Sequence, residues 1–299
     1  MTTSQAPRVF TPKNMGDRDL SFAEATGTKT LSTEQIATYN ERGYLHPLTA
    51  FDSDAILPVR AYFDQLFNLM KARGVTDNYA MLGYHTRCPG LYDIVKNRQI
   101  LDVVEDIIGP DIICWTSHAF CKVAHDRKAV LFHQDGSYWP LTPARTVSAW
   151  LAIDDSDREN SCLQVIPGTH KMGQLPWGKA RDNAVLDQAM DNPTVYGVPK
   201  YIELKAGQFS IHADMMAHGS DPNPSDRRRC GFAIRYCPPS VTPLKKDWSR
   251  NALLCRGNDT TGYWTYSGRP EKDDVGDWPS YWMRKYKEGA DIRGGNIGA

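Results

Sequence analysis

The 299-residue sequence lacks an excess of either charge, a long apolar run and any Cys-x-x-Cys pair. Lys plus Arg number 35, as do Asp plus Glu, so the charge balance favours neither nucleic acid nor an anionic membrane surface as a partner. No stretch reaches the roughly 18 apolar residues of a membrane-spanning helix, and the N-terminus has no apolar signal-peptide core. The seven cysteines include several in apolar strand-like runs, where cysteine is usually a small buried hydrophobe. We therefore expect a soluble cytoplasmic protein in a reducing compartment, without zinc fingers.

The chain divides into a helical first part and a strand-rich second part. Ser32-Thr-Glu-Gln35 has the form of a capping box and predicts a helix to about Arg42, which Gly43 ends. Apolar residues at helical spacing predict a second helix that starts near Ile56, and a third is expected at 100–108. After that, short apolar or alternating runs are separated by Pro-Gly, Ala-Gly and Asn-Pro turn signals. The expected strands are 112–123, 129–133, 146–153, 162–166, 201–204, 208–212 and 229–236.

Helices followed by many short strands predict a mainly β chain with flanking helices. The expected fold is a double-stranded β-helix, a cupin-like jelly roll, packed against N-terminal helices. We expect a single domain over 1–299, with a loose polar arm at 1–30, helical support at 31–110, a jelly-roll core at 111–240 and an aromatic-rich extension at 241–299. The extension is interpreted as an added strand and helix on the barrel, with a lid or subunit contact as the alternative. The oligomeric state is left open.

The segment His133-Gln-Asp135, together with His218 far downstream, carries the chemistry. In an extended segment, residues two apart place their side chains on the same face. Two imidazoles and one carboxylate are the minimal ligand set for non-haem Fe(II), and they leave one face of the metal open. His133, Asp135 and His218 are therefore predicted metal ligands.

These residues belong to a longer pattern, made up of the stretches Phe132–Asp135, Val147–Ile153, Glu159–His170, Lys205–Phe209 and His218–Tyr236. The pattern resembles the phytanoyl-CoA dioxygenase family of Fe(II)/2-oxoglutarate oxygenases. The resemblance implies Fe(II), 2-oxoglutarate and O2 as cofactors, and hydroxylation of a small molecule with release of succinate and CO2. The segments Gly109–Trp115 and Arg229–Tyr236 also resemble the halogenase branch, which replaces the carboxylate ligand by Ala or Gly. Because Asp135 is present here, hydroxylation is expected.

The sequence contains a second candidate pair, His212-Ala-Asp214, only a few residues before His218. In the family the first pair and the distal histidine come from different strands. His133, Asp135 and His218 fit that arrangement better, so His212 is expected to be a core histidine or to lie just outside the ligand set.

The resemblance also implies a cation for the C5 carboxylate of 2-oxoglutarate. A guanidinium suits this role because it pairs bidentately with a carboxylate. The family position about eleven residues after the distal histidine corresponds to Arg229, with Arg227 and Arg228 as rivals. Arg229 shares a strand face with small residues at 231 and 233, which are expected to leave room for a ligand. Two further residues are expected near 2-oxoglutarate, Trp150 and Lys122, for which a core position and a strand-end lysine are the alternatives.

The predicted substrate contacts are His118, Tyr138, Trp139 and Arg235. They offer aromatic walls and a cation for an anionic group, so we expect a small polar metabolite such as an amino acid, a phosphonate or a natural-product intermediate. Phytanoyl-CoA itself is not expected, because no basic patch for the CoA phosphates is visible. Desaturation, epimerisation or cyclisation by the same iron chemistry is the first alternative, and a cupin-like binding protein without turnover is the second.

Overall fold

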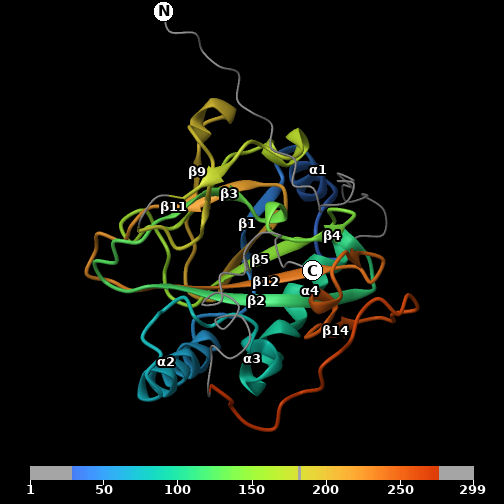
Figure 1. Ribbon diagram of the computed structural model, residues 1–299, viewed down its shortest axis with the longest axis horizontal. Helices are drawn as coiled ribbons and strands as arrows, with labels where there is room; N and C mark the ends of the chain where they lie inside the picture. Colours follow the sequence, from blue (N-terminus) through green and yellow to red (C-terminus); the bar gives the residue numbers. More distant parts are fainter. Residues whose placement is uncertain (1–28, 181–182, 276–299) are drawn as a thin grey trace, which may run out of the picture.

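The computed structural model describes residues 29–180 and 183–275 (Figure 1). Nearly all of the predicted arm and the last part of the predicted extension therefore lie outside the described residues. The α-helices are α1 (Thr33–Arg42), α2 (Ile56–Ala72), α3 (Pro89–Val95) and α4 (Arg98–Ile108). The strands are β1 (Tyr44–Thr49), β2 (Ile112–Lys122), β3 (Val130–Gln134), β4 (Leu141–Thr142), β5 (Val147–Ala152), β6 (Leu163–Val165), β7 (Gly178–Lys179), β8 (Gln188–Ala189), β9 (Lys200–Ile202), β10 (Gln208–Ala213), β11 (Ala217–Ser220), β12 (Arg229–Cys237), β13 (Thr242–Pro243) and β14 (Leu253–Arg256).

Local signals in the sequence set the ends of the predicted helices. In α1 the Ser32 side chain accepts from the Gln35 backbone and the Gln35 side chain accepts from the Ser32 backbone, so the predicted capping box is present. Gly43 ends this helix with φ 82°, a left-handed conformation that favours glycine. The side chain of Asn97 caps α4, which begins two residues before the predicted start at Ile100.

Two antiparallel sheets form the body of the molecule. The larger sheet has the order β1-β10-β5-β12-β2-β14, and the smaller has the order β3-β11-β6-β9. Neighbours that are distant in sequence, such as β10 beside β5 and β12 beside β2, are typical of a jelly roll. The predicted fold class, mainly β with flanking helices, is confirmed.

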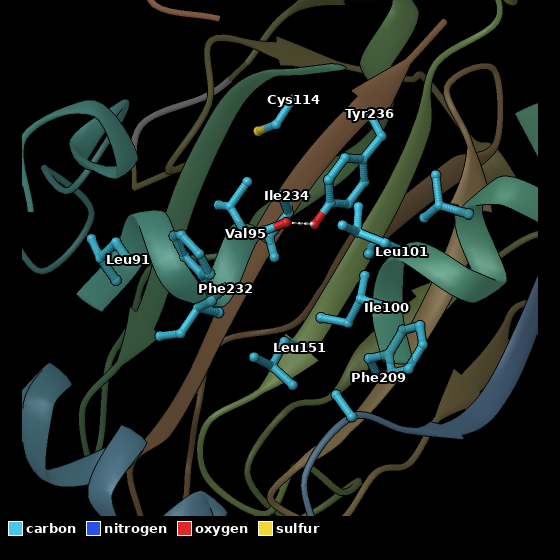
Figure 2. Close-up of a cluster of buried hydrophobic side chains, with 14 of the residues drawn as sticks. Leu91, Val95, Ile100, Leu101, Cys114, Leu151, Phe209, Phe232, Ile234 and Tyr236 are labelled. Atoms are coloured by element: carbon cyan, nitrogen blue, oxygen red, sulfur yellow. Dashed lines mark hydrogen bonds between the residues drawn. The ribbon is translucent and has the colours of Figure 1, made fainter. Parts of the chain in front are cut away.

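The larger sheet separates two apolar layers. Alternate residues of its strands point to opposite faces, and one face packs on α2, α3 and α4 (Figure 1). Figure 2 shows this layer, in which Phe232 and Tyr236 of β12 lie among helix residues and the Tyr236 hydroxyl donates to the Val95 carbonyl at 2.8 Å. The opposite face looks toward the smaller sheet, and a second cluster that includes Phe120, Trp150 and Ala233 fills the space between them. Because both faces of β12 are buried, its inner face can hold polar groups away from water.

Several features differ from the expectation. The stretch predicted as helical support also contains β1, which forms an edge of the larger sheet by pairing with β10, and the short helix α3 was not predicted. Lys29 and Thr30, assigned to the loose arm, donate their backbone N–H groups to the Asp106 carboxylate. Part of the extension adds β14 to the edge of the larger sheet, as the strand interpretation expects. Among the described residues, no helix is both long and apolar enough to cross a membrane.

Candidate active site

His133 and His218 face each other across two neighbouring strands of the smaller sheet. They are directly paired residues of β3 and β11, and their ring centroids are 4.2 Å apart. Asp135 lies just after β3, at the start of a 3-10 turn, while Gln134 between them keeps an extended backbone. The Asp135 Oδ1 atom is 3.6 Å from Nε2 of His133 and 4.0 Å from Nε2 of His218. These three buried side chains form the one cluster among the described residues whose ligand atoms could hold a metal ion.

Backbone carbonyls orient both imidazoles. Nδ1 of His133 lies 2.8 Å from the Leu131 carbonyl, and Nδ1 of His218 lies 2.9 Å from the Met216 carbonyl. A carbonyl only accepts, so Nδ1 carries the proton in each ring and Nε2 keeps its lone pair. Such bonds fix the ring and its tautomer for metal binding. Burial together with the neighbouring His133 holds the pKa of His218 well below its usual value, which also favours the neutral ligand form.

The second oxygen of Asp135 is held by the larger sheet. Its Oδ2 accepts from the Ser148 hydroxyl at 3.3 Å and lies 3.6 Å from Nε of Arg235. Burial alone would raise the pKa of this carboxyl, but Arg235 and the two imidazoles hold it well below its usual range. Asp135 is thus an ionised carboxylate with one oxygen turned to the histidines. The three side chains fit the two-histidine, one-carboxylate set of Fe(II) enzymes.

His212 packs against this cluster without joining it. Its ring centroid is 4.7 Å from that of His218, and the side chain is buried. Neither ring nitrogen has a hydrogen-bond partner among the described residues. Burial lowers its pKa to about 4, so the ring is neutral at physiological pH. The structure therefore places His212 where the sequence expects it, beside the predicted ligands and outside their set.

Arg229 lies buried beside the strand that carries His218. Its Nη2 donates to the Ser220 hydroxyl at 3.2 Å and its Nη1 to the Phe120 carbonyl at 3.4 Å. Its Nε has no partner, and no carboxylate pairs with it among the described residues. Ser220 is two residues after His218 on β11, which is about 6.5 Å along one strand face. A buried guanidinium without an anion is unfavourable, so this arrangement fits the distal carboxylate of a bound 2-oxoglutarate.

Lys122 lies next to Arg229 but offers little to an anion. Its amine is surrounded by the backbone carbonyls of Lys128, Ser220 and Asp221. Burial, with a further contribution from Arg229, lowers its pKa to about 6. Its N–H donors face backbone carbonyl groups, so little of the amine is left for an anion. The structure does not bring it to an open site, and its contact with 2-oxoglutarate stays a prediction.

Trp150 occupies the space that Gly231 leaves on the inner face of β12. A Cβ atom at Gly231 would lie 1.9 Å from the Trp150 ring, and the Arg229 guanidinium carbon is 5.4 Å from that ring's centroid. The sequence interpretation, in which the small residue at 231 leaves room for a ligand, is wrong at this position. The glycine makes room for the indole, and the indole in turn supports the arginine.

Replacing Gly231 with alanine is therefore expected to displace Trp150 from beneath Arg229. The Gly231→Ala protein should lose about 1–3 kcal/mol of unfolding free energy, as overpacked interiors do. Urea unfolding monitored by tryptophan fluorescence would measure this. Gly178→Ala is the matched control, because a Cβ there meets nothing within 4 Å, and its change should stay within about 0.5 kcal/mol. Equal stability of the two variants would contradict the proposed packing.

The predicted substrate contacts Tyr138 and Trp139 extend the site away from the histidines. The Tyr138 ring lies 5.8 Å from that of His133, and its hydroxyl accepts from the Gln188 backbone at 3.1 Å. The Trp139 ring stands edge-on to Trp115 at 4.8 Å between centroids. The segment around β8 thus contacts Tyr138. The sequence analysis did not include this segment among the site residues.

His118 and Arg235, the other two predicted substrate contacts, occupy the inner face of the larger sheet. His118 Nε2 is 2.6 Å from the Tyr79 carbonyl, and its ring is 4.2 Å from that of Phe120. Burial and the charge of Arg235 lower the His118 pKa to about 4, so this ring is neutral and a weak partner for an anion. Arg235 contacts Asp135, a partner that sequence reasoning missed.

Two serines complete the site and were also missed. Ser148 bonds to Asp135 and Ser220 to Arg229. Each lies two residues from a predicted site residue on the same strand, Trp150 and His218 respectively. Applying the strand period of two around each predicted residue would have found both.

Comparisons with known proteins place the chain in a family. The family model described as Phytanoyl-CoA dioxygenase (PhyH) matches residues 39–231, more than half of the chain. The peroxisomal phytanoyl-CoA dioxygenase of Mus musculus is 39% identical over 265 residues, covering 78% of this chain and 75% of that protein. The chain spans about half the length of several curated relatives. For the probable phytanoyl-CoA dioxygenase of Caenorhabditis elegans, the match is 28% identical and covers 50% of this chain and 51% of that protein.

Solved structures agree with this placement. The non-heme monooxygenase ThoJ is 28% identical with a TM-score of 0.70, covering 84% of this chain and 95% of that chain. CytC3, solved with Fe(II) and alpha-ketoglutarate, has a TM-score of 0.59 at 21% identity, covering 82% of this chain and 97% of that chain. The second likeness supports the fold.

The family and the cluster of His133, Asp135 and His218 fit oxygenases whose cofactors are Fe(II), 2-oxoglutarate and O2. Enzymes of this kind act on small-molecule substrates. The chain belongs to the phytanoyl-CoA dioxygenase family.

Proposed function

We propose that the chain hydroxylates a small polar metabolite, one able to carry an anionic group, in a reaction that depends on Fe(II) and 2-oxoglutarate. An amino acid, a phosphonate or a natural-product intermediate would fit. The observation that carries the proposal is the ionised carboxylate of Asp135 beside the Nε2 atoms of His133 and His218. In the halogenase branch this position is Ala or Gly, so a carboxylate here supports hydroxylation.

The proposed roles follow from the contacts. His133, Asp135 and His218 hold the metal, and the Leu131 and Met216 carbonyls keep both rings in the ligand tautomer. Together, Fe(II), 2-oxoglutarate and O2 supply the oxidation, in which the co-substrate leaves as succinate and CO2 and one oxygen atom goes to the substrate.

Arg229 binds the distal carboxylate of 2-oxoglutarate and is supported by Ser220 and Trp150. The aromatic residues Tyr138 and Trp139 exclude water on the substrate side. The cofactors therefore supply the oxidation, and the protein positions the co-substrate and the substrate.

Two other functions are the alternatives to hydroxylation. Desaturation, epimerisation or cyclisation would use the same residues, and a binding protein would use them without turnover. The cytoplasmic location stays a prediction, and the mouse relative is named as peroxisomal.

The proposal predicts uptake of one oxygen atom from O2 into the product. The Fe(II)-loaded protein with 2-oxoglutarate would be screened against amino acids, phosphonates, natural-product intermediates and phytanoyl-CoA, with succinate as the readout. Active mixtures would be repeated under ¹⁸O2 and analysed by mass spectrometry. Hydroxylation gives a product that carries the label, whereas desaturation, epimerisation and cyclisation give unlabelled products. Labelled product from phytanoyl-CoA and not from the small polar compounds would contradict the proposed substrate class.

A further inference from the structure

Arg235 is a buried cation whose hydrogen-bonding capacity is unused. The side chain is 8% exposed and its Nε lies 3.6 Å from Oδ2 of Asp135, too far for a hydrogen bond. Its Nε has no hydrogen-bond partner, and no other hydrogen bond to its guanidinium is found among the described residues. The guanidinium carbon lies 5.5 Å from the centroid of Trp139 and 6.0 Å from that of Phe120. A guanidinium carries five N–H donors, so this one is held by stacking and charge with its donors free.

With Fe(II) and 2-oxoglutarate bound, the charges in the site leave one positive charge without a balancing anion. When the proposed function holds, the two charges of Fe(II) are balanced by Asp135 and by the carboxylate of 2-oxoglutarate nearest the metal. The distal carboxylate is balanced by Arg229. His118 is neutral, because burial and Arg235 lower its pKa to about 4. Arg235 then remains as a buried positive charge without its own anion, an arrangement that is unfavourable unless a ligand supplies one.

A second unused donor lies in the neighbouring aromatic cluster, in which the Trp115 ring contacts those of Trp139 and Trp248. The indole Nε1 of Trp115 is buried and has no acceptor among the described residues. Trp115 contacts Trp139 edge-on, and Trp139 in turn faces the Arg235 guanidinium. Buried donors usually find an acceptor, so two unpartnered donor groups joined by one aromatic ring indicate a ligand that carries acceptor oxygens.

Resting on the proposed function, we propose that the primary substrate presents an oxyanion, a carboxylate or a phosphorus oxyacid group, to Arg235. The indole of Trp139 supports the guanidinium from one side. Asp135 contacts both Arg235 and the histidines. The substrate anion therefore binds next to the metal, and the oxidised carbon lies close to that anion.

Small anions test this assignment without knowledge of the substrate. The anaerobic protein loaded with Fe(II) and 2-oxoglutarate would be titrated with acetate and with methylphosphonate while its visible charge-transfer absorption is followed. Acetamide and dimethyl methylphosphonate are the uncharged controls, and sodium chloride matches the ionic strength. We expect both anions to perturb the absorption at concentrations on the order of 10 mM, as fragments of this size bind weakly, and the uncharged compounds to have no effect. Comparison of the two anions shows which oxyanion the site prefers.

Variants of Arg235 test whether this residue causes the response to anions. Arg235→Gln should weaken the anion response by about tenfold or more, because charge-assisted hydrogen bonds are lost. Arg235→Lys should retain part of it and serves if the glutamine variant does not hold iron. Arg227→Gln makes the same change at an exposed arginine that pairs with Asp157 and Glu159, and should respond as the unchanged protein does.

Two results would overturn the assignment while leaving the proposed function standing. One is a normal charge-transfer absorption that neither anion perturbs. The other is an anion response that Arg235→Gln retains in full. Absence of the absorption in the unchanged protein with Fe(II) and 2-oxoglutarate would instead remove the proposed function on which the assignment rests.

Discussion

Replacing His133 or His218 with alanine is expected to reduce bound iron from about one per chain to near zero, and to abolish 2-oxoglutarate consumption. Each imidazole presents Nε2 to the Asp135 carboxylate because a backbone carbonyl holds its Nδ1. Two remaining ligands cannot retain the ion in a site whose other positions are open to co-substrate and O2. Metal analysis after removal of excess iron would measure the loss directly, independently of turnover.

His212→Ala is the matched control for this experiment. The ring is buried and packs against His218 at a tilt, but it lies outside the cluster of ligand atoms. We expect iron to remain near one per chain, with a loss of stability because a buried side chain is removed. Loss of iron in His212→Ala with retention in His133→Ala would show that the ligand set is misassigned.

Arg229→Ala is expected to raise the apparent 2-oxoglutarate constant by about two orders of magnitude or more. The change removes about two charge-assisted hydrogen bonds, each worth roughly 1.5–3 kcal/mol, and about 1.4 kcal/mol corresponds to tenfold. Because the guanidinium has no carboxylate partner among the described residues, its loss leaves no protein anion unpaired. Iron binding should therefore persist, which separates this variant from the histidine variants.

The measurement is 2-oxoglutarate consumption against its concentration, with iron content determined in parallel. Arg227→Ala is the control, since that arginine is exposed and pairs with surface acids, and its constant should stay within about twofold of the unchanged protein. An unchanged constant in Arg229→Ala would remove this residue from the co-substrate site. A large defect in Arg235→Gln with none in Arg229→Ala would reverse the roles of the two arginines.

Most elements of the fold could be predicted from local patterns in the sequence. The capping box at Ser32 and the left-handed glycine at Gly43 act within one turn, so the end of α1 is readable without tertiary information. The strand β11 is different, because Ala217–Ser220 has no apolar alternation and is extended through its pairing with β3 and β6. Its existence depends on partners that the local sequence does not reveal.

The site likewise combines residues that the sequence predicts with contacts that depend on tertiary structure. His133, Asp135 and His218 could be predicted because iron chemistry restricts the residue types, and the structure brings these three side chains together. The contact between Arg235 and Asp135 joins two strands far apart in sequence, and side-chain alternation gives only the face on which each residue lies. The use of the space at Gly231 by Trp150 likewise depends on the register between β12 and β5, which spacing within one strand cannot supply.

An anaerobic titration tests most directly whether His133, Asp135 and His218 form a site for Fe(II) and 2-oxoglutarate. The metal-free protein would receive Fe(II) and then 2-oxoglutarate while the visible charge-transfer absorption of the chelated metal is recorded. We expect an absorption that saturates at about one equivalent of each in the unchanged protein. We expect none in His133→Ala or His218→Ala. Absence of the absorption in the unchanged protein, or equal absorption in the histidine variants, would contradict this assignment of the site.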